Sequence, residues 1–136
     1  MVLLLGLLLI QTTYNMITVS KNISKLSNGE VNIYYSVQPE RIEYQLALNA
    51  ITSWNNKNDL LQFALERHGY CNTDSMSGIT YPSDLDDFDR DVDKITINEG
   101  FILVYSEQFT PKEAYLTEED YLTILNAYFK VSKNTK

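Results

Sequence analysis

Six aspartates crowd into one short stretch of this chain, and they are the side chains best suited to chemistry. Residues 83–93 read SDLDDFDRDVD, and the carboxylates are those of Asp84, Asp86, Asp87, Asp89, Asp91 and Asp93, relieved only by Arg90. Mutual repulsion disfavours such a run in a folded segment unless cations, helix N-terminal amides or a partner offset it. A calcium site, a catalytic carboxylate pair and a protein-binding surface are the three chemical interpretations.

A calcium loop fits part of the run. The four aspartates from Asp87 to Asp93 that alternate along the chain match loop positions 1, 3, 5 and 7 of an EF-hand. Position 6, where the loop turns sharply and needs glycine, is Val92, and position 12, where a bidentate glutamate belongs, is Asn98. An exported or calcium-binding accessory protein therefore stays as the alternative function, with no metal ligand assigned.

The sequence contains few of the residue patterns on which catalysis depends. Paired carboxylates need environments that push their pKa values apart, whereas aspartates on a polar segment all stay solvated and ionised. Glycine-rich phosphate loops, nucleophile elbows and metal-spaced Cys or His sets are missing from the sequence. The single histidine, His68, and the single cysteine, Cys71, lie where a helix is expected to end, which favours a buried or half-buried helix end. We expect no enzyme activity, no cofactor and no catalytic residue.

A protein-binding surface is the third interpretation of the acidic run. Aromatic side chains among carboxylates can anchor a partner while the charges steer it. Tyr81 and Phe88 are the candidate anchors, beside all six aspartates. The competing structural interpretation is a solvated acidic loop that packs Leu85 and Phe88 inward.

Composition supports a folded, acidic binding protein. The 136 residues include 44% hydrophobic side chains, ten tyrosines and five phenylalanines, enough for one core without disulfides or metals. The net charge is −7, from 18 acidic and 11 basic side chains. Such a surface repels phosphate backbones, so we expect no direct nucleic-acid binding. The acidity would suit a basic protein partner, and the alternative is that it only keeps the protein soluble.

The strands and helices that must position the acidic run are mostly segregated along the chain. Residues 16–19 and 31–37 read as strands joined by an Asn-Gly turn, and residues 101–105 (FILVY) as a central strand. Residues 94–98 alternate polar and apolar, residues 79–81 form a brief extended segment, and residues 114–116 form a short strand. The pattern predicts an α+β fold: a mostly antiparallel sheet of about five strands with three helices packed against it.

Three helices are expected. One starts with Pro39 in its first turn and continues to Trp54; the next begins at Asp59, paired with Gln62 as a capping box, and ends at Gly69 as C-cap. The last helix follows Thr117 as N-cap, with an apolar stripe of Leu122, Leu125 and Phe129. Residues 16–136 form a single α+β domain.

The apolar run at residues 2–10, VLLLGLLLI, is too short to span a membrane, which takes about 20 residues. No basic residue precedes it and no small-x-small cleavage site follows. For residues 1–15, translation that starts at Met16, a weak export signal and an ordered strand or helix all remain open, and localisation depends on this choice.

Four stretches together resemble bacterial toxin-immunity proteins, particularly those of contact-dependent growth inhibition systems. They are GYC (69–71), SGITYPSDLDDFDRDVDKI (77–95), GFILVY (100–105) and YLTEEDYLTIL (115–125). The resemblance implies a small cytoplasmic protein that binds one cognate toxin, often a nuclease with a basic cleft, and blocks that cleft without chemistry of its own. The acidic run, with Tyr81 and Phe88, would then face the toxin.

Overall fold

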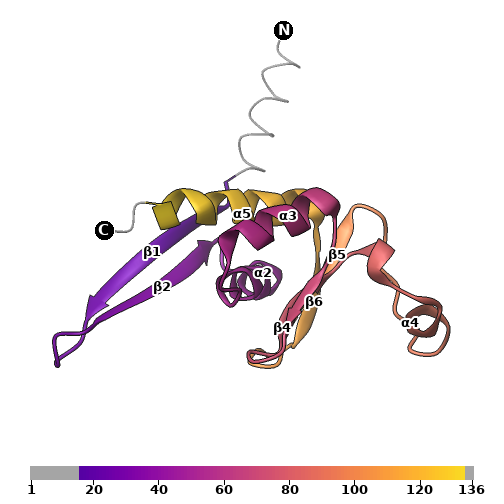
Figure 1. The fold of residues 1–136 in the computed structure, drawn as a ribbon, viewed down its shortest axis with the longest axis horizontal. Helices are drawn as coiled ribbons and strands as arrows, with labels where there is room; N and C mark the ends of the chain where they lie inside the picture. The colour runs from indigo at the N-terminus through magenta and orange to yellow at the C-terminus, as the bar shows by residue number, and fades with distance from the viewer. Residues whose placement is uncertain (1–15, 134–136) are drawn as a thin grey trace, which may run out of the picture.

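The computed structural model describes residues 16–133. The three interpretations of residues 1–15 concern a segment outside this range. Within it the molecule is elongated: a two-stranded ribbon projects at one end, a four-stranded sheet with the acidic segment (residues 82–98) forms the other, and helices lie between (Figure 1).

The ribbon is an antiparallel hairpin of β1 (Thr18–Lys25) and β2 (Val31–Gln38). Its turn contains Gly29, whose φ of +88° is a backbone conformation that side chains with a Cβ rarely adopt. The predicted hairpin is confirmed, and its first strand is longer than residues 16–19. Only the base of the ribbon is covered, since Val19 and Val37 are buried there.

The central helix α2 (Ile42–Thr52) fills the space between the ribbon and the sheet. Its fully buried side chains are Leu46, Ala47, Ala50 and Ile51. Pro39 lies before the helix, whose N-cap is Arg41, so the predicted place of Pro39 in the first turn was wrong.

Helix α3 (Lys57–Glu66) begins and ends at other residues than the sequence predicted. Asn56 is the N-cap, because its side chain accepts a hydrogen bond from the Asn58 N–H; Asp59 already lies inside the helix. At the far end Arg67, not Gly69, takes the left-handed cap conformation, with φ 51°.

The second sheet contains β3 (Tyr70–Asn72), β4 (Ser77–Thr80), β5 (Phe101–Ser106) and β6 (Glu113–Thr117), antiparallel in that order. The apolar run at 101–105 is an inner strand, as predicted, with Ile102 and Val104 fully buried. Residues 94–98 form no strand, and the short β3 was not predicted.

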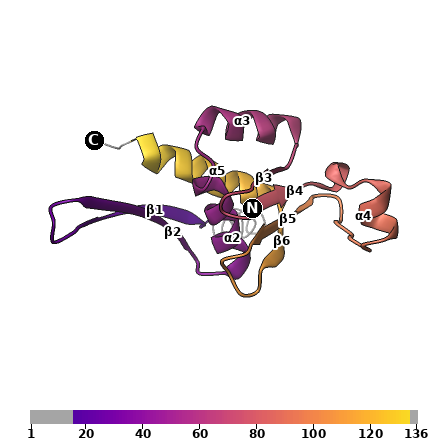
Figure 2. The same cartoon turned by 60° about the horizontal axis from the view of Figure 1, so that its bottom comes forward.

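Helix α5 (Glu118–Lys133) lies along the ribbon base and α2 (Figures 1 and 2). Thr117 caps it as predicted, its Oγ1 accepting from the Asp120 N–H at 3.1 Å. The buried side is rotated from the predicted stripe: Leu122 and Phe129 are half-buried, and the side chains in the core are those of Tyr121, Ile124, Leu125 and Tyr128. The α+β class is confirmed: residues 16–133 contain six strands divided between two antiparallel sheets, where one sheet was expected.

The core position of β5 gives a testable difference between two adjacent residues. Ile102→Ala should lower the free energy of unfolding by about 2–5 kcal/mol, because Ile102 is fully buried and the cavity cannot close completely. Phe101→Ala is the matched control, since Phe101 is 38% exposed, and should lower it much less. Urea unfolding followed by circular dichroism measures both; equal losses would contradict the described orientation of β5.

Candidate protein-binding surface

The acidic segment, residues 82–98, connects β4 to β5 and is folded. It contains the single-turn 3₁₀ helix η1 (Pro82–Asp84) and the short helix α4 (Asp87–Asp91). In Figure 1 α4 projects from the sheet at the end of the molecule opposite the ribbon. The run of aspartates therefore lies largely on ordered helical turns and not on a mobile loop.

Helix α4 is capped at its N-terminus by two of its own aspartates. Asp86 Oδ1 accepts from the Asp89 N–H at 2.8 Å, and Asp89 Oδ2 accepts from the Asp86 N–H at 3.0 Å. This reciprocal pair is a capping box, which satisfies backbone donors that the helix leaves open. The bond from the Asp89 N–H lowers the pKa of Asp86 from its usual value of 3.8, so the cap is present at neutral pH and is lost in acid.

Arg90 partly neutralises the same turn. Its guanidinium donates to the Leu85 carbonyl at 2.6 Å and to Asp87 Oδ1 at 2.9 Å. The Asp87 side chain is 93% exposed, so this ion pair is solvated and contributes little stability. The arginine mainly folds the chain of the segment back on itself.

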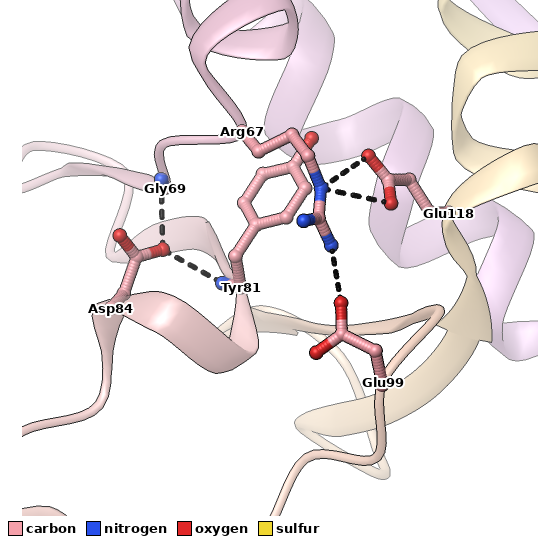
Figure 3. Close-up of polar contacts among 6 residues, drawn as sticks. All are labelled: Arg67, Gly69, Tyr81, Asp84, Glu99 and Glu118. Atoms are coloured by element: carbon pink, nitrogen blue, oxygen red, sulfur yellow. Dashed lines mark hydrogen bonds and ion pairs between the residues drawn. The ribbon is translucent and has the colours of Figure 1, made fainter.

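The start of the segment is held to the body by Asp84. Its Oδ2 accepts from the Gly69 N–H at 2.9 Å and from the Tyr81 N–H at 2.7 Å (Figure 3). A side chain at Gly69 would collide with the Ile79 carbonyl and this carboxylate, so the close approach requires glycine. His68 Nδ1 lies 3.4 Å from the other carboxylate oxygen.

The end of the segment is held by Arg67. Its Nε lies 3.1 and 3.0 Å from the two carboxylate oxygens of Glu118, and its Nη2 donates to Glu99 at 3.0 Å (Figure 3). The hydrogen bond with Glu118 raises the pKa of Arg67 most, and the hydrogen bond with Glu99 raises it further. The guanidinium also lies 5.8 Å from the centre of the Tyr81 ring. We call Arg67, Asp84, Glu99 and Glu118 the anchor of the acidic segment.

The anchor changes the predicted role of Tyr81. This tyrosine is 1% exposed, so its prediction as a partner-binding residue was wrong: its ring packs in the core, against Arg67. Burial raises the pKa of Tyr81 to about 12, so its hydroxyl stays protonated at physiological pH. Asp84 is likewise a structural residue, with a side chain only 20% exposed.

The remaining predicted residues form the outer surface of the segment. Phe88 is 60% exposed, so it does not pack inward as the competing interpretation expected. Asp86, Asp87, Asp91 and Asp93 are exposed and Asp89 is half-buried. The sequence analysis missed Val92, which is 59% exposed and lies four residues after Phe88, so the two share one side of α4. That spacing was visible in the sequence.

The aspartates do not converge on a metal. Among residues 16–133, no group of three or more His, Cys, Asp or Glu side chains is placed to hold an ion. Asp86 and Asp89 are turned to the helix cap and Asp87 to Arg90, so these three carboxylates have partners within the segment. The calcium alternative has no geometric support here.

A shallow cavity of about 420 Å³ lies between the acidic segment and the sheet. Its lining includes Leu85 and Asp89 from the segment, and His68, Cys71 and Tyr105 from the body. The Tyr105 hydroxyl donates to Cys71 Sγ at 2.6 Å. Cys71 and His68 are both exposed, so the prediction that they lie at a buried or half-buried helix end was wrong.

Removing the Asp84 carboxylate should release the acidic segment. Asp84→Ala leaves two backbone N–H groups without an acceptor, which should lower the free energy of unfolding by about 1–3 kcal/mol. Hydrogen exchange at the Gly69 and Tyr81 amides should become faster. Asp84→Asn, which keeps an oxygen acceptor, and Asp87→Ala, which removes an exposed carboxylate, should change these amides much less. Unchanged exchange in Asp84→Ala would refute the anchor.

Within residues 16–133, every helix is too short or too polar to cross a membrane. No protein-family model, curated protein or solved structure matches the chain. The charge and geometry of the acidic segment are therefore the observations on which a function can be built.

Proposed function

We propose that this chain is an immunity protein that binds a cognate bacterial toxin and neutralises it. The observation that carries the proposal is α4, an ordered and projecting helix at which Phe88 and Val92 are exposed among aspartates. Exposed apolar side chains surrounded by charge are typical of a protein-binding hot spot. The acidic segment is the binding surface, and the toxin face that it covers is basic.

Order in the segment favours binding. A flexible acidic loop would lose conformational entropy when a partner fixes it, whereas a segment already held by its anchor and capped by Asp86 and Asp89 loses less. A larger share of the contact energy therefore remains as binding free energy. The same preorganisation fixes the separation of Phe88 from the carboxylates, which allows one toxin to be distinguished from another.

The charge of the segment has two parts with different roles. Asp84, Asp86 and Asp89 accept backbone hydrogen bonds, and Asp87 pairs with Arg90. Asp91 and Asp93 form no side-chain hydrogen bond or ion pair with any other residue that the structure describes. Together with a net charge of −7, these carboxylates speed the approach of a basic protein and give its binding a strong dependence on salt.

A nuclease is the toxin class that this surface suits best. The active-site cleft of a nuclease attracts phosphates and is basic, so a row of carboxylates can occupy it in place of nucleic acid. The same carboxylates repel nucleic acid from the immunity protein itself. We place the protein in the cytoplasm of the producing cell, where such a toxin acts, and assign it no catalytic step; the resemblance described above supports this assignment.

The exposed carboxylates should be needed for capture and protection. The tagged full chain is used to capture a basic polypeptide from its own host, and the captured polypeptide is then produced in indicator cells. We expect growth arrest by that polypeptide and rescue by the chain. The triple variant Asp87→Asn, Asp91→Asn, Asp93→Asn should lose most of the rescue and slow association, because steering charge is removed while the caps remain.

A matched control changes the same amount of charge elsewhere. Glu66→Gln, Asp74→Asn and Glu113→Gln are exposed substitutions away from α4 and should leave rescue intact. Phe88→Ala should weaken binding by about 2 kcal/mol or more, roughly thirtyfold, if Phe88 is a hot-spot anchor. Full rescue by both the triple variant and Phe88→Ala would show that the acidic segment is not the binding face.

A further inference from the structure

One face of the ribbon has an apolar stripe that is buried at the base of the ribbon and exposed further out. Residues directly opposite each other in β1 and β2 share a face, and one face pairs Val19 with Val37 and Ile23 with Ile33. At the base, Val19 and Val37 are 6% and 3% exposed. Further out, Ile23 and Ile33 are 61% and 43% exposed. The face that enters the core at one end is open to solvent at the other.

Helix α5 covers this face only near the base of the ribbon. Tyr35, on the same face, packs edge-on against Tyr128 of α5 with ring centres 5.0 Å apart. The helix packs on β1 near the base of the ribbon, and the hairpin extends past it (Figures 1 and 2). Val31, the next residue outward on this face, is 56% exposed, and Leu26 at the turn is 45% exposed. We call Ile23, Val31 and Ile33 the outer stripe.

The surroundings of the outer stripe are basic, although the protein is acidic. Lys21 and Lys25 lie on the same face, and the last turn of α5 adds Lys130 and Lys133. Glu30 is the one acidic residue of the ribbon and its turn. Two outer stripes facing each other would bring these lysines together, so like charges disfavour a symmetric pairing of ribbons.

The complement to this surface lies at the opposite end of the same molecule. Phe88 and Val92 are exposed on α4, and Asp87 and Asp91 are exposed beside them. An apolar pair flanked by acid matches an apolar stripe flanked by lysine.

We propose that α4 of a second copy of this chain docks on the outer stripe. Phe88 and Val92 then cover Ile23 and Ile33, with Asp87 and Asp91 next to Lys21 and Lys25. Because the two surfaces lie at opposite ends of one molecule, the contact joins copies head to tail and leaves one surface of each kind unused. The proposal concerns self-association and stands whether or not a toxin is the partner of α4; where one is, toxin and second copy compete.

Sedimentation velocity of the full chain tests this at rising concentration and at two salt concentrations. We expect reversible species larger than a monomer that weaken as salt screens the charges. Ile33→Glu, on the outer stripe, and Phe88→Lys, on α4, should each weaken association by about tenfold or more, as loss of a hot-spot residue does. Tyr34→Glu, 51% exposed on the other face of the ribbon, and Leu65→Lys, 72% exposed on α3, are the matched controls and should associate like the unmodified chain.

Mixing the two defective variants gives the decisive result. Ile33→Glu retains an intact α4 and Phe88→Lys retains an intact outer stripe, so the mixture should form a one-to-one complex that grows no further. The proposal is overturned if the unmodified chain stays monomeric at its solubility limit, or if the mixture stays monomeric. It is also overturned if Phe88→Lys alone associates normally, because the ribbons would then pair in another way. All substitutions are at exposed positions, and circular dichroism confirms that each variant is folded.

Discussion

The acidic end of this molecule depends on two sets of contacts with the body, the hydrogen bonds that Asp84 accepts and the exposed ion pairs of Arg67. Asp84 closes the start of the segment onto the Gly69 and Tyr81 amides, and Arg67 closes its end through Glu99. These contacts oppose the mutual repulsion of six carboxylates in a 17-residue connection. The antiparallel pairing of β4 with β5 keeps the two ends of the segment together, and the Asp84 hydrogen bonds and the capping box of α4 order the chain between them.

Arg67 also links the end of the acidic segment to the core. Arg67 also bonds Glu118, the first residue of α5, and lies against the Tyr81 ring (Figure 3). The backbone reinforces this junction, because the Glu118 N–H donates to the Gly100 carbonyl at 2.8 Å. The guanidinium at the end of α3 therefore joins the first residue of α5 to Tyr81 and Glu99, the two residues that flank the acidic segment. The planar, permanently charged arginine can serve all three partners at once, which a lysine could not do with the same geometry.

Local signals in the sequence predicted those parts of the fold that are determined locally. The hairpin, the inner strand at 101–105 and the Thr117 cap each follow from a turn residue, an apolar run or a capping side chain. The anchor could not be found this way, because Arg67 bonds Glu99 and Glu118, which are 32 and 51 residues distant in the chain. Tyr81 was misplaced for the same reason: a tyrosine beside an acidic run looks exposed until tertiary packing turns it inward. The three residues of β3 are too few to carry a strand pattern.

The spacing of the aspartates has a physical explanation that composition alone does not reveal. Asp86 and Asp89 are three apart because a capping box needs that interval, and Asp84 lies where its carboxylate can reach the amides of Gly69 and Tyr81. Asp91 and Asp93 have no such duty. Half of the run thus holds the segment together, and this is what allows the other half to remain exposed at high local charge. Some of the carboxylates therefore stabilise the fold of the segment. The helix that they cap exposes the remaining carboxylates, together with Phe88, to solvent or to a partner.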